Sequence, residues 1–597
     1  MNPGERGHDI ISTASESLTS LILLYFQYMR IPPIRPLLFA AVFFSGSASV
    51  HAQPGPALNY PPQKMVTCST GAVVSAHPLA SRVGLQVLKS GGNAIDAAIA
   101  TQLALAVVYP GAGNIGGGGF MVAHLANGKN LTIDFREKAP EASSRNMYLD
   151  VKNNVIPGKS EDGHLAAGVP GTIAGIFTYY PYAKLPFKKL IQPAIDLAEN
   201  GFAITAAEAA DLNDNQEGFK KYNSVVPVFV KASPWKAGDI LVQKDLAKTL
   251  RRIRDEGANG FYRGETARLI VEEMKRGKGL ISFTDLKNYA AKERPPVIFS
   301  YKKDYTLITM PLPSSGGILL PQMMGMVENR DLHALGFETV SSVHLMAEVE
   351  RLAYADRAKY LGDVDFYKVP VKTLTSDAYL KTRMQKFNPD SAGNSEQIQA
   401  GTIHESEETT HFDTYDQEGN CVAITTTLNG GYGSRTVVAG AGFLLNNEMD
   451  DFSIKPGVPN MYGAVGGEAN AIAPGKRMLS SMTPTIVLYK QKPYLIVGTP
   501  GGTTITTSVF QTLVDIIDFG MSVSDAVNKP KFHHQWLPDI LYIEKGFPVD
   551  VAAQLQRMGY TVKEREAIGR TEVIRISPSG ELEAVADWRG DDDAEGY

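Results

Sequence analysis

The peptide bond between Glu408 and Thr409 is where the residue types point to the most specific chemistry. A polar stretch ends at Glu408, and Thr409 begins a run of residues typical of a β-strand. If the Thr409 hydroxyl attacks the preceding carbonyl, the peptide becomes an ester, which water opens to leave threonine at a new N-terminus. An α-amino group titrates at about 7.7 to 8.0, so near neutral pH part of it is free base. Thr409 could then supply both nucleophile and general base, although Thr-Thr at a strand start is ordinarily only β-propensity.

A glycine-rich segment imitates a nucleotide-binding motif. Residues 111–116 have the spacing Gly-x-Gly-x-x-Gly, and Asp134 lies about where a ribose-binding acid belongs. That motif requires a helix to begin within it, because the helix N-terminus must meet the pyrophosphate. Here Gly117 to Phe120 lead into another strand-like segment. We therefore expect no NAD or FAD site, and we interpret the glycines as places where the backbone bends tightly or approaches another group.

The histidines do not form a recognisable metal motif. His344 and Glu348 are one helical turn apart, but no second histidine lies four residues from the first. The pair His533 and His534 has no such partner either. We interpret all three as hydrogen-bonded structural histidines and expect no metal. The sequence also lacks a Gly-x-Ser-x-Gly elbow, which disfavours an α/β-hydrolase.

The composition is that of a globular protein. A length of 597 residues allows three or four domains, or fewer if large sheets are involved. Because 58 Lys and Arg nearly balance 63 Asp and Glu, a generally basic nucleic-acid binder is excluded, and 44% hydrophobic residues argue against disorder. The presence of only two cysteines, Cys68 and Cys421, excludes a disulfide scaffold or a cysteine-rich zinc module. We expect both to be free thiols, and a disulfide between them in an oxidising compartment is the alternative.

The N-terminal region is typical of a secretory signal. Arg30 and Arg35 precede the apolar run Pro36–Val50, and small residues up to Ala52 suit a cleavage site. We expect residues 1–52 to be the signal segment and Met29 to be the true start. A retained signal anchor is the alternative, but a helix that crosses lipid needs about 20 apolar residues. The prediction is an exported protein, periplasmic or secreted, with no stable membrane span.

The elements that must position Thr409 change in kind along the chain. In the first two-thirds, apolar residues recur at helical spacing. The expected helices are Pro78–Ser90, Ala97–Val108, Lys188–Asn200, Asp245–Glu256, Thr266–Arg276 and Ser342–Leu361. Asn93 is the expected N-cap of the second helix, with Asp96 placed to reach back to its free amides. That helix is nearly all apolar, so we expect it to be central.

The last third is rich in strands. Asn388–Glu408 is poor in large apolar residues and is interpreted as an exposed linker. Thr409–Asp416 and Cys421–Leu428 flank turn residues and predict a β-hairpin. A second hairpin, 484–489 and 494–497, continues through a Gly-rich loop at 498–502 into an expected helix at 503–519.

Several separated motifs resemble the γ-glutamyltranspeptidase family in order and spacing. They are Thr409–Phe412, Thr427–Asn429, Leu444–Phe452, Lys455–Asn460, Ser480–Met482 and Gly498–Gly502, with Gly116–Phe120 and Asp134–Glu137 in the first part. The resemblance runs from about Val66 to Tyr597. It implies an α+β fold, the four-layer αββα sandwich of N-terminal-nucleophile hydrolases. It also implies that the protein cuts itself into a large subunit, 53–408, and a small subunit, 409–597, which form one intertwined domain.

The resemblance implies a role for each matching residue. Thr409 is the nucleophile, Thr427 positions it through a hydroxyl, and the backbone N–H groups of Gly501 and Gly502 meet the oxyanion, where fixed donors cost no reorganisation. The remaining residues would bind the substrate's amino-acid head. Arg136, Ser480 and Ser481 would hold its α-carboxylate, Asn429, Glu448 and Asp451 its α-ammonium, and Tyr462 in the lid loop Lys455–Gly467 would cover the site.

These roles imply a self-processing γ-glutamyltransferase and hydrolase that uses no cofactor. It would take the γ-glutamyl group of glutathione and related amides onto Thr409, then pass it to water, an amino acid or a peptide. Its partners would be small molecules and its own two subunits, with no nucleic acid. One alternative is an acylase of the same family that takes glutaryl side chains. Another is a processed but inactive binding protein.

Overall fold

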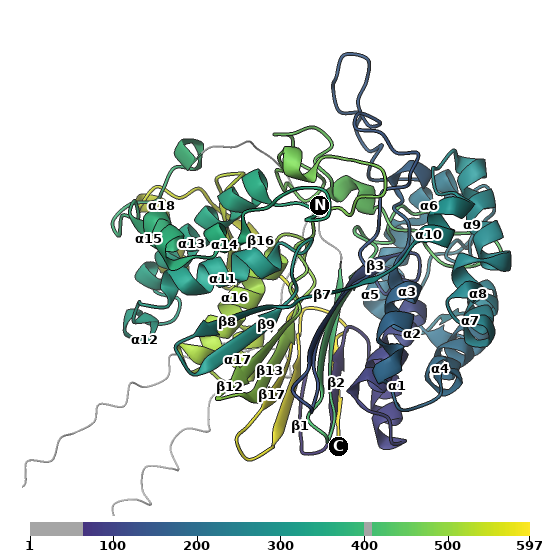
Figure 1. The fold of residues 1–597 in the computed structure, drawn as a ribbon, viewed down its shortest axis with the longest axis horizontal. Helices are drawn as coiled ribbons and strands as arrows, with labels where there is room; N and C mark the ends of the chain where they lie inside the picture. Colours follow the sequence, from purple (N-terminus) through teal and green to yellow (C-terminus); the bar gives the residue numbers. More distant parts are fainter. Residues whose placement is uncertain (1–63, 399–408) are drawn as a thin grey trace, which may run out of the picture. The chain divides into compact units, whose positions relative to one another are not determined.

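Two antiparallel sheets of seven strands lie face to face at the centre of the protein (Figure 1). The computed structural model describes residues 64–398 and 409–597. The expected signal segment, Met29 and Glu408 lie outside the described residues. The first sheet has the strand order β1 (Lys64–Cys68), β18 (Leu582–Ala586), β17 (Glu572–Ile576), β13 (Lys492–Gly498), β12 (Thr485–Tyr489), β9 (Tyr305–Thr309) and β8 (Val297–Tyr301). The second has the order β19 (Asp593–Gly596), β2 (Ala72–Ser75), β10 (Thr410–Tyr415), β11 (Cys421–Thr427), β3 (Gly118–His124), β4 (Asn130–Asp134) and β7 (Lys292–Arg294).

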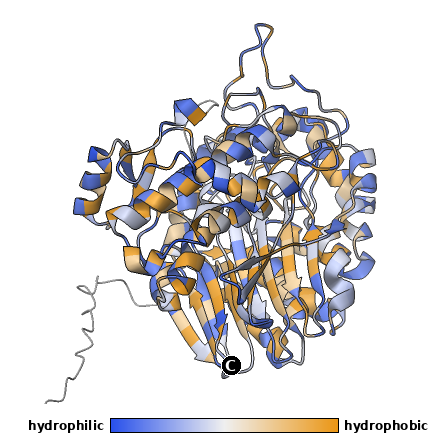
Figure 2. Ribbon diagram, turned by 60° about the vertical axis from the view of Figure 1, so that its left-hand side comes forward, coloured by the Kyte–Doolittle hydropathy of each residue, from blue (hydrophilic) through white to orange (hydrophobic). Residues whose placement is uncertain are grey.

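Alternating side chains bury both faces of each sheet. In β2, for example, Ala72 and Val74 point between the sheets, whereas Val73 points to the helices on the outer side. The strands are accordingly apolar along most of their length, as their orange colour in Figure 2 shows. The mixed helix and sheet fold that the sequence predicted is confirmed.

Helices cover the outer face of each sheet (Figure 1). Those against the second sheet are α1 (Pro78–Lys89), α2 (Ala94–Val108), α3 (Thr172–Tyr179), α4 (Phe187–Asn200), α5 (Ala206–Asp214), α6 (Gln216–Tyr222), α7 (Lys244–Glu256), α8 (Asn259–Tyr262), α9 (Gly264–Gly277) and α10 (Phe283–Asn288). Those on the side of the first sheet are α11 (Gly316–Val327), α12 (Leu332–Leu335), α13 (Val340–Tyr360), α14 (Val371–Leu374), α15 (Asp377–Met384), α16 (Thr504–Ile517), α17 (Val523–Asn528) and α18 (Val549–Arg557). A small sheet of β14 (Phe532–His533), β15 (Leu541–Glu544) and β16 (Val562–Arg565) and the pair β5 (Phe202–Ala203) and β6 (Ile240–Leu241) complete the described strands.

The predicted start of α2 is confirmed in detail. The Asn93 side chain accepts a hydrogen bond from the Asp96 amide, and the Asp96 carboxylate accepts one from the Asn93 amide. This reciprocal pair is a capping box. All fifteen residues of the helix are buried, so it is central as its sequence predicted.

One segment differs from its prediction. The described part of the expected linker, 388–398, is mostly exposed, but Ser395 is buried. Its amide donates to Asp539 (2.8 Å), and its hydroxyl accepts from the Arg351 guanidinium, held by the same aspartate. The hydropathy of the segment cannot predict that one serine is buried by polar contacts of this kind. Along the described residues, no helix combines the length and apolar character needed to span a bilayer.

Candidate active site

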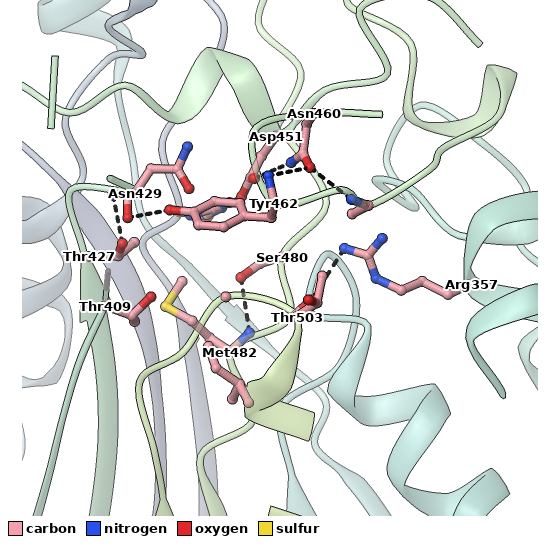
Figure 3. A pocket seen from close by; sticks show the side chains of 15 residues that line it. Arg357, Thr409, Thr427, Asn429, Asp451, Asn460, Tyr462, Ser480, Met482 and Thr503 are labelled. Atoms are coloured by element: carbon pink, nitrogen blue, oxygen red, sulfur yellow. Dashed lines mark hydrogen bonds and ion pairs between the residues drawn. The ribbon is translucent and has the colours of Figure 1, made fainter. Parts of the chain in front are cut away.

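Thr409 lies at the open end of the central hairpin, directly before β10. The next residue, Thr410, begins β10 and pairs with Thr426 of β11, so the ladder brings Thr409 alongside Thr427 at the end of β11. Both threonines are buried, and both line one small cavity (Figure 3). The two hairpins and the loop-to-helix segment before α16 that the sequence predicted are confirmed.

The glycine-rich segment supports this strand end and lacks the helix start of a dinucleotide-binding motif. Strand β3 begins at Gly118, where a dinucleotide site needs a helix. A Cβ on Gly117 would lie 2.0 Å from the carbonyl oxygen of Thr427, so only glycine fits there. Asn114 adds to the contact, because its amide donates to the Thr427 carbonyl (2.8 Å) and accepts from the Gly117 N–H (2.8 Å).

The cavity collects most of the predicted site residues. Nine of the eleven line it directly, namely Arg136, Thr409, Thr427, Asn429, Asp451, Tyr462, Ser480, Ser481 and Gly502. Six further residues complete the lining, namely Arg357, Asn460, Ala464, Met482, Thr503 and Ile505. Gly501 precedes Gly502 in the same loop, and Glu448 lies behind Arg136. The cavity has about 20 Å³, room for about one water molecule, so a substrate needs part of its wall to move.

Arg136 is fully engaged by acidic side chains. Its guanidinium forms an ion pair with Asp451 and another with Glu448 at 2.5 Å, and it is 1% exposed. It also donates weakly to the carbonyl of Leu479 (3.4 Å). Burial raises the pKa of Asp451 above its ordinary value, while Arg136 opposes that shift. The arginine therefore holds a carboxylate at the cavity wall that would otherwise tend to take up a proton.

Glu448 is placed differently from the simplest expectation. Its carboxylate is wholly buried and faces Arg136, so the cavity wall at this point belongs to Asp451. Burial raises the pKa of Glu448, and the charge of Arg136 opposes this shift. Glu448 therefore lies behind the arginine and does not line the cavity itself.

Tyr462 closes the cavity over Asn429. Its hydroxyl donates to the Asn429 carbonyl (Figure 3). The Asn429 amide in turn donates to the Thr427 hydroxyl (2.7 Å). Asn460 ties this segment to the charged wall, since its side chain donates to Asp451 (2.9 Å) and accepts from the Tyr462 amide (3.0 Å). Specific polar contacts therefore hold Asn460 and Tyr462, two residues of the segment Lys455–Gly467, at the cavity wall.

Gly501 and Gly502 form the loop between β13 and α16. Their φ angles are +132° and +53°, which favour glycine. A Cβ on Gly502 would lie 2.9 Å from the Tyr462 ring, so the missing side chain lets the loop lie close under the tyrosine. Because α16 begins at Thr504, the positive end of its backbone dipole lies beside the cavity. This positive end would stabilise an oxyanion that forms in the cavity near Gly502.

Ser480 and Ser481 lie beside a residue that the sequence did not single out. The Arg357 guanidinium on α13 donates to the Ser481 hydroxyl (3.2 Å) and to the Ser315 hydroxyl (3.3 Å). No sequence signal marked Arg357, because α13 is buried on most of its surface and lacks a single polar face. Asn460 was also missed as a site residue, although it ends a motif that the resemblance included.

The structural histidines have ordinary partners. His344 bonds through its two ring nitrogens to Tyr560 and to the Asn388 carbonyl, both at 2.8 Å. His533 bonds to Thr507 and Gln535. Within residues 64–398 and 409–597, no group of three His, Cys, Asp or Glu side chains is arranged to hold a metal ion. Cys68 and Cys421 are free thiols, as expected.

Comparison with known proteins agrees with this geometry. The family model for gamma-glutamyltranspeptidase matches residues 80–597. The chain belongs to the γ-glutamyltranspeptidase family. The glutathione hydrolase proenzyme of Escherichia coli (strain K12) is 45% identical over 93% of this chain and 97% of its own length. The resemblance inferred from separated motifs is therefore confirmed.

Two solved structures are similar to this fold. A cephalosporin acylase from Bacillus halodurans superimposes with a TM-score of 0.80 at 26% identity, covering 91% of this chain and 99% of its own. A γ-glutamyltranspeptidase chain from Helicobacter pylori is 50% identical, with a TM-score of 0.53, and covers 56% of this chain and 96% of its own. A protein named as an acylase and one named as a transpeptidase are thus both similar in fold to this chain.

Proposed function

We propose that this protein is a self-processing γ-glutamyltransferase and glutathione hydrolase. The observation that carries the proposal is a single cavity that joins a strand-leading threonine to charged side chains of both signs. Thr409 would cut the chain before itself, and its free amine would then act as the general base for its own hydroxyl. The donor's γ-glutamyl group would form an ester with Thr409, which water, an amino acid or a peptide would resolve.

The positions of the other residues in or beside the cavity support the roles proposed for them. Gly501 and Gly502 would donate backbone N–H groups to the oxyanion, and Thr427 would position the nucleophile. Asp451 and Asn429 would receive the α-ammonium, with Glu448 acting from behind Arg136. Arg136, Ser480 and Ser481, which all line the cavity, would receive the α-carboxylate. Tyr462 would close the site. The arrangement suits a zwitterionic head and needs no cofactor or metal.

The proposed architecture is the four-layer αββα sandwich of an N-terminal-nucleophile hydrolase, divided into subunits 53–408 and 409–597. It is supported by three apolar clusters, one between the two sheets and one between each sheet and its helices. The proposal includes export to the periplasm or outside the cell under the signal segment 1–52.

An acylase for glutaryl donors is the main rival, since a cephalosporin acylase shares the fold. The buried wall formed by Asp451 and Asn429 argues against it, because these acceptors would face a donor without a cation. An inactive binding protein is the other rival.

The test compares the wild type with the Thr409→Ala and Thr409→Ser variants. The wild type is expected to yield two chains and to hydrolyse a γ-glutamyl anilide much faster than the matching glutaryl anilide. Thr409→Ala should remain one inactive chain, and Thr409→Ser should process and turn over more slowly. A small subunit beginning at residue 409 in the alanine variant would contradict self-processing, and faster glutaryl hydrolysis by the wild type would favour the acylase.

A further inference from the structure

A second cavity lies apart from the Thr409 cavity, the one that contains Thr409. It has about 250 Å³, room for on the order of ten water molecules, whereas the Thr409 cavity has about 20 Å³. Among the described residues, none lines both cavities. Both predicted subunits contribute to the wall of the second cavity, Lys138 and Tyr289 from the first, Gly475 and Arg477 from the other. A small molecule therefore has space here without entering the Thr409 cavity.

Most charged side chains at the wall of the second cavity already have partners. Lys292 forms an ion pair with Asp365 at 2.6 Å. Arg477 forms one with Asp134 at 3.2 Å. Asp285 accepts three hydrogen bonds at the start of α10. These groups are satisfied within the protein and do not need a ligand.

Lys138 is a cation of this wall without such a partner. Its ammonium lies over the Tyr289 ring, 5.6 Å from the ring centre, and no carboxylate of the described residues lies at ion-pair distance from it. Burial lowers the pKa of Lys138, and the cations Arg477 and Lys292 lower it further. A carboxylate placed beside this ammonium would oppose both effects.

Glu141 offers the opposite charge at the same wall. Its side chain is exposed, and in the part of the chain that the structure describes no cation lies at ion-pair distance from it. A Cβ on Gly475, whose φ is +70°, would lie 2.9 Å from a carboxylate oxygen of Glu141, so glycine leaves room for this carboxylate. Tyr289 and Phe366 add aromatic surface. The second cavity thus presents one available charge of each sign beside two rings.

We propose that the second cavity binds short peptides that carry a free ammonium and a free carboxylate. The peptide carboxylate pairs with Lys138 and the ammonium with Glu141, which fixes the direction of the peptide. A dipeptide suits the cavity better than a single amino acid, because Lys138 and Glu141 are three positions apart in the sequence, whereas the two charges of an amino acid lie on one carbon atom. A few polar groups that converge on a cavity with aromatic walls are typical of small-molecule sites. This inference goes beyond the proposed function and does not depend on it, because binding here requires no turnover.

The experiment measures Kd for three ligands of similar size by NMR titration of the ligand signals, without any γ-glutamyl donor. Glycylglycine carries both charges, N-acetylglycine only the carboxylate, and glycylglycinamide only the ammonium. The wild type should bind glycylglycine with a Kd on the order of 1 mM. Each singly charged ligand should bind about three- to tenfold more weakly, because it leaves one of the two charges without a partner.

Two variants assign the two charges. Lys138→Met should weaken glycylglycine and N-acetylglycine about three- to tenfold and leave glycylglycinamide unchanged. Glu141→Gln should weaken glycylglycine and glycylglycinamide and leave N-acetylglycine unchanged. Because Glu141 is exposed, its variant should fold and decides the matter if Lys138→Met does not mature.

Lys159→Met is the matched control. Lys159 is also a half-buried lysine at a cavity wall, but it lines a different cavity and its ammonium donates to the Met147 carbonyl (2.8 Å). It should leave all three Kd values unchanged. Neither Lys138 nor Glu141 lines the Thr409 cavity, so peptide bound there would not respond to their substitution.

Three results would overturn the assignment. An equal loss for all three ligands in Lys138→Met would make the lysine a packing residue. Unchanged affinities in both Lys138→Met and Glu141→Gln would place the peptide elsewhere, and wild type that binds N-acetylglycine as tightly as glycylglycine would have only an anion site. A wild type that shows this peptide binding but hydrolyses no γ-glutamyl anilide would refute the proposed function alone, so the two failures are distinguishable.

Discussion

Asp451 has two tasks that are separable by experiment. It forms an ion pair with Arg136 inside the protein and presents its carboxylate at the cavity wall. Removing one member of a buried pair commonly costs about 3 to 5 kcal/mol, because the other charge is left without compensation. If a neutral residue replaces Asp451, Arg136 still forms an ion pair with Glu448. The loss of folding stability should therefore be smaller than this range.

Asp451→Asn should therefore mature and yet lose donor discrimination. If Asp451 faces the substrate ammonium, kcat/KM for a γ-glutamyl anilide should fall at least about tenfold. The glutaryl anilide should be spared or improved, because it has no cation to offer the carboxylate. The measurement is the ratio of kcat/KM for the two donors on the fully processed variant. Equal losses for both would mean that Asp451 supports only Arg136 and the fold.

At the scale of single elements, the loop before α16 depends on one close contact. Gly502 has a φ of +53° and lies under the Tyr462 ring, so an added methyl group meets both backbone strain and the ring. Gly520, near the other end of the same helix, has a φ of +67° and nothing within 4 Å of an added Cβ. Alanine at Gly520 would therefore add backbone strain alone, whereas alanine at Gly502 would add both backbone strain and a close contact with Tyr462.

Gly502→Ala should lower kcat at least tenfold, whereas Gly520→Ala should cost only stability. The alanine at 502 must push Tyr462 outward or shift the backbone N–H groups proposed to meet the oxyanion, and losing one such donor costs about 10²- to 10³-fold. Steady-state kinetics with a γ-glutamyl anilide, and thermal melting of both variants, give the comparison. Similar kcat values for the two variants would show that the contact with Tyr462 is unimportant for turnover.

Local elements were predictable from the sequence because their determinants are local. The capping box of Asn93 and Asp96 and the hairpin from Thr409 are encoded within a few residues. The position of Arg357 could not be predicted from the sequence, because α13 is surrounded by the protein and its charged residues point in several directions. The ion pair between Arg136 and Asp451 joins residues 315 positions apart, and only the family resemblance placed both in one site.

At the scale of the whole molecule, each of the two large sheets contains strands from both predicted subunits. In the second sheet, β2 from the first part of the chain lies between β19 and β10 from the last part, and β11 lies beside β3. In the first sheet, β1 pairs with β18, and β9 pairs with β12. Separation of the subunits would break these ladders and expose apolar faces, so each subunit lacks a complete core without the other.

The processed protein should therefore remain a heterodimer at nanomolar concentration and separate only on unfolding. Strand β19 should contribute measurably, since it pairs with β2 and the Tyr597 carbonyl accepts from the Thr70 amide (2.9 Å). Deleting residues 593–597 should lower the melting temperature by several degrees and slow maturation, because one side of β2 loses its ladder. Tyr597→Ala is the matched control, because it keeps the backbone bonds and removes only the side chain. Size-exclusion chromatography of diluted samples, with melting curves for both variants, tests these points. Free subunits on dilution, or a deletion no worse than Tyr597→Ala, would mean that the interleaved strands hold the subunits together less than their ladders indicate.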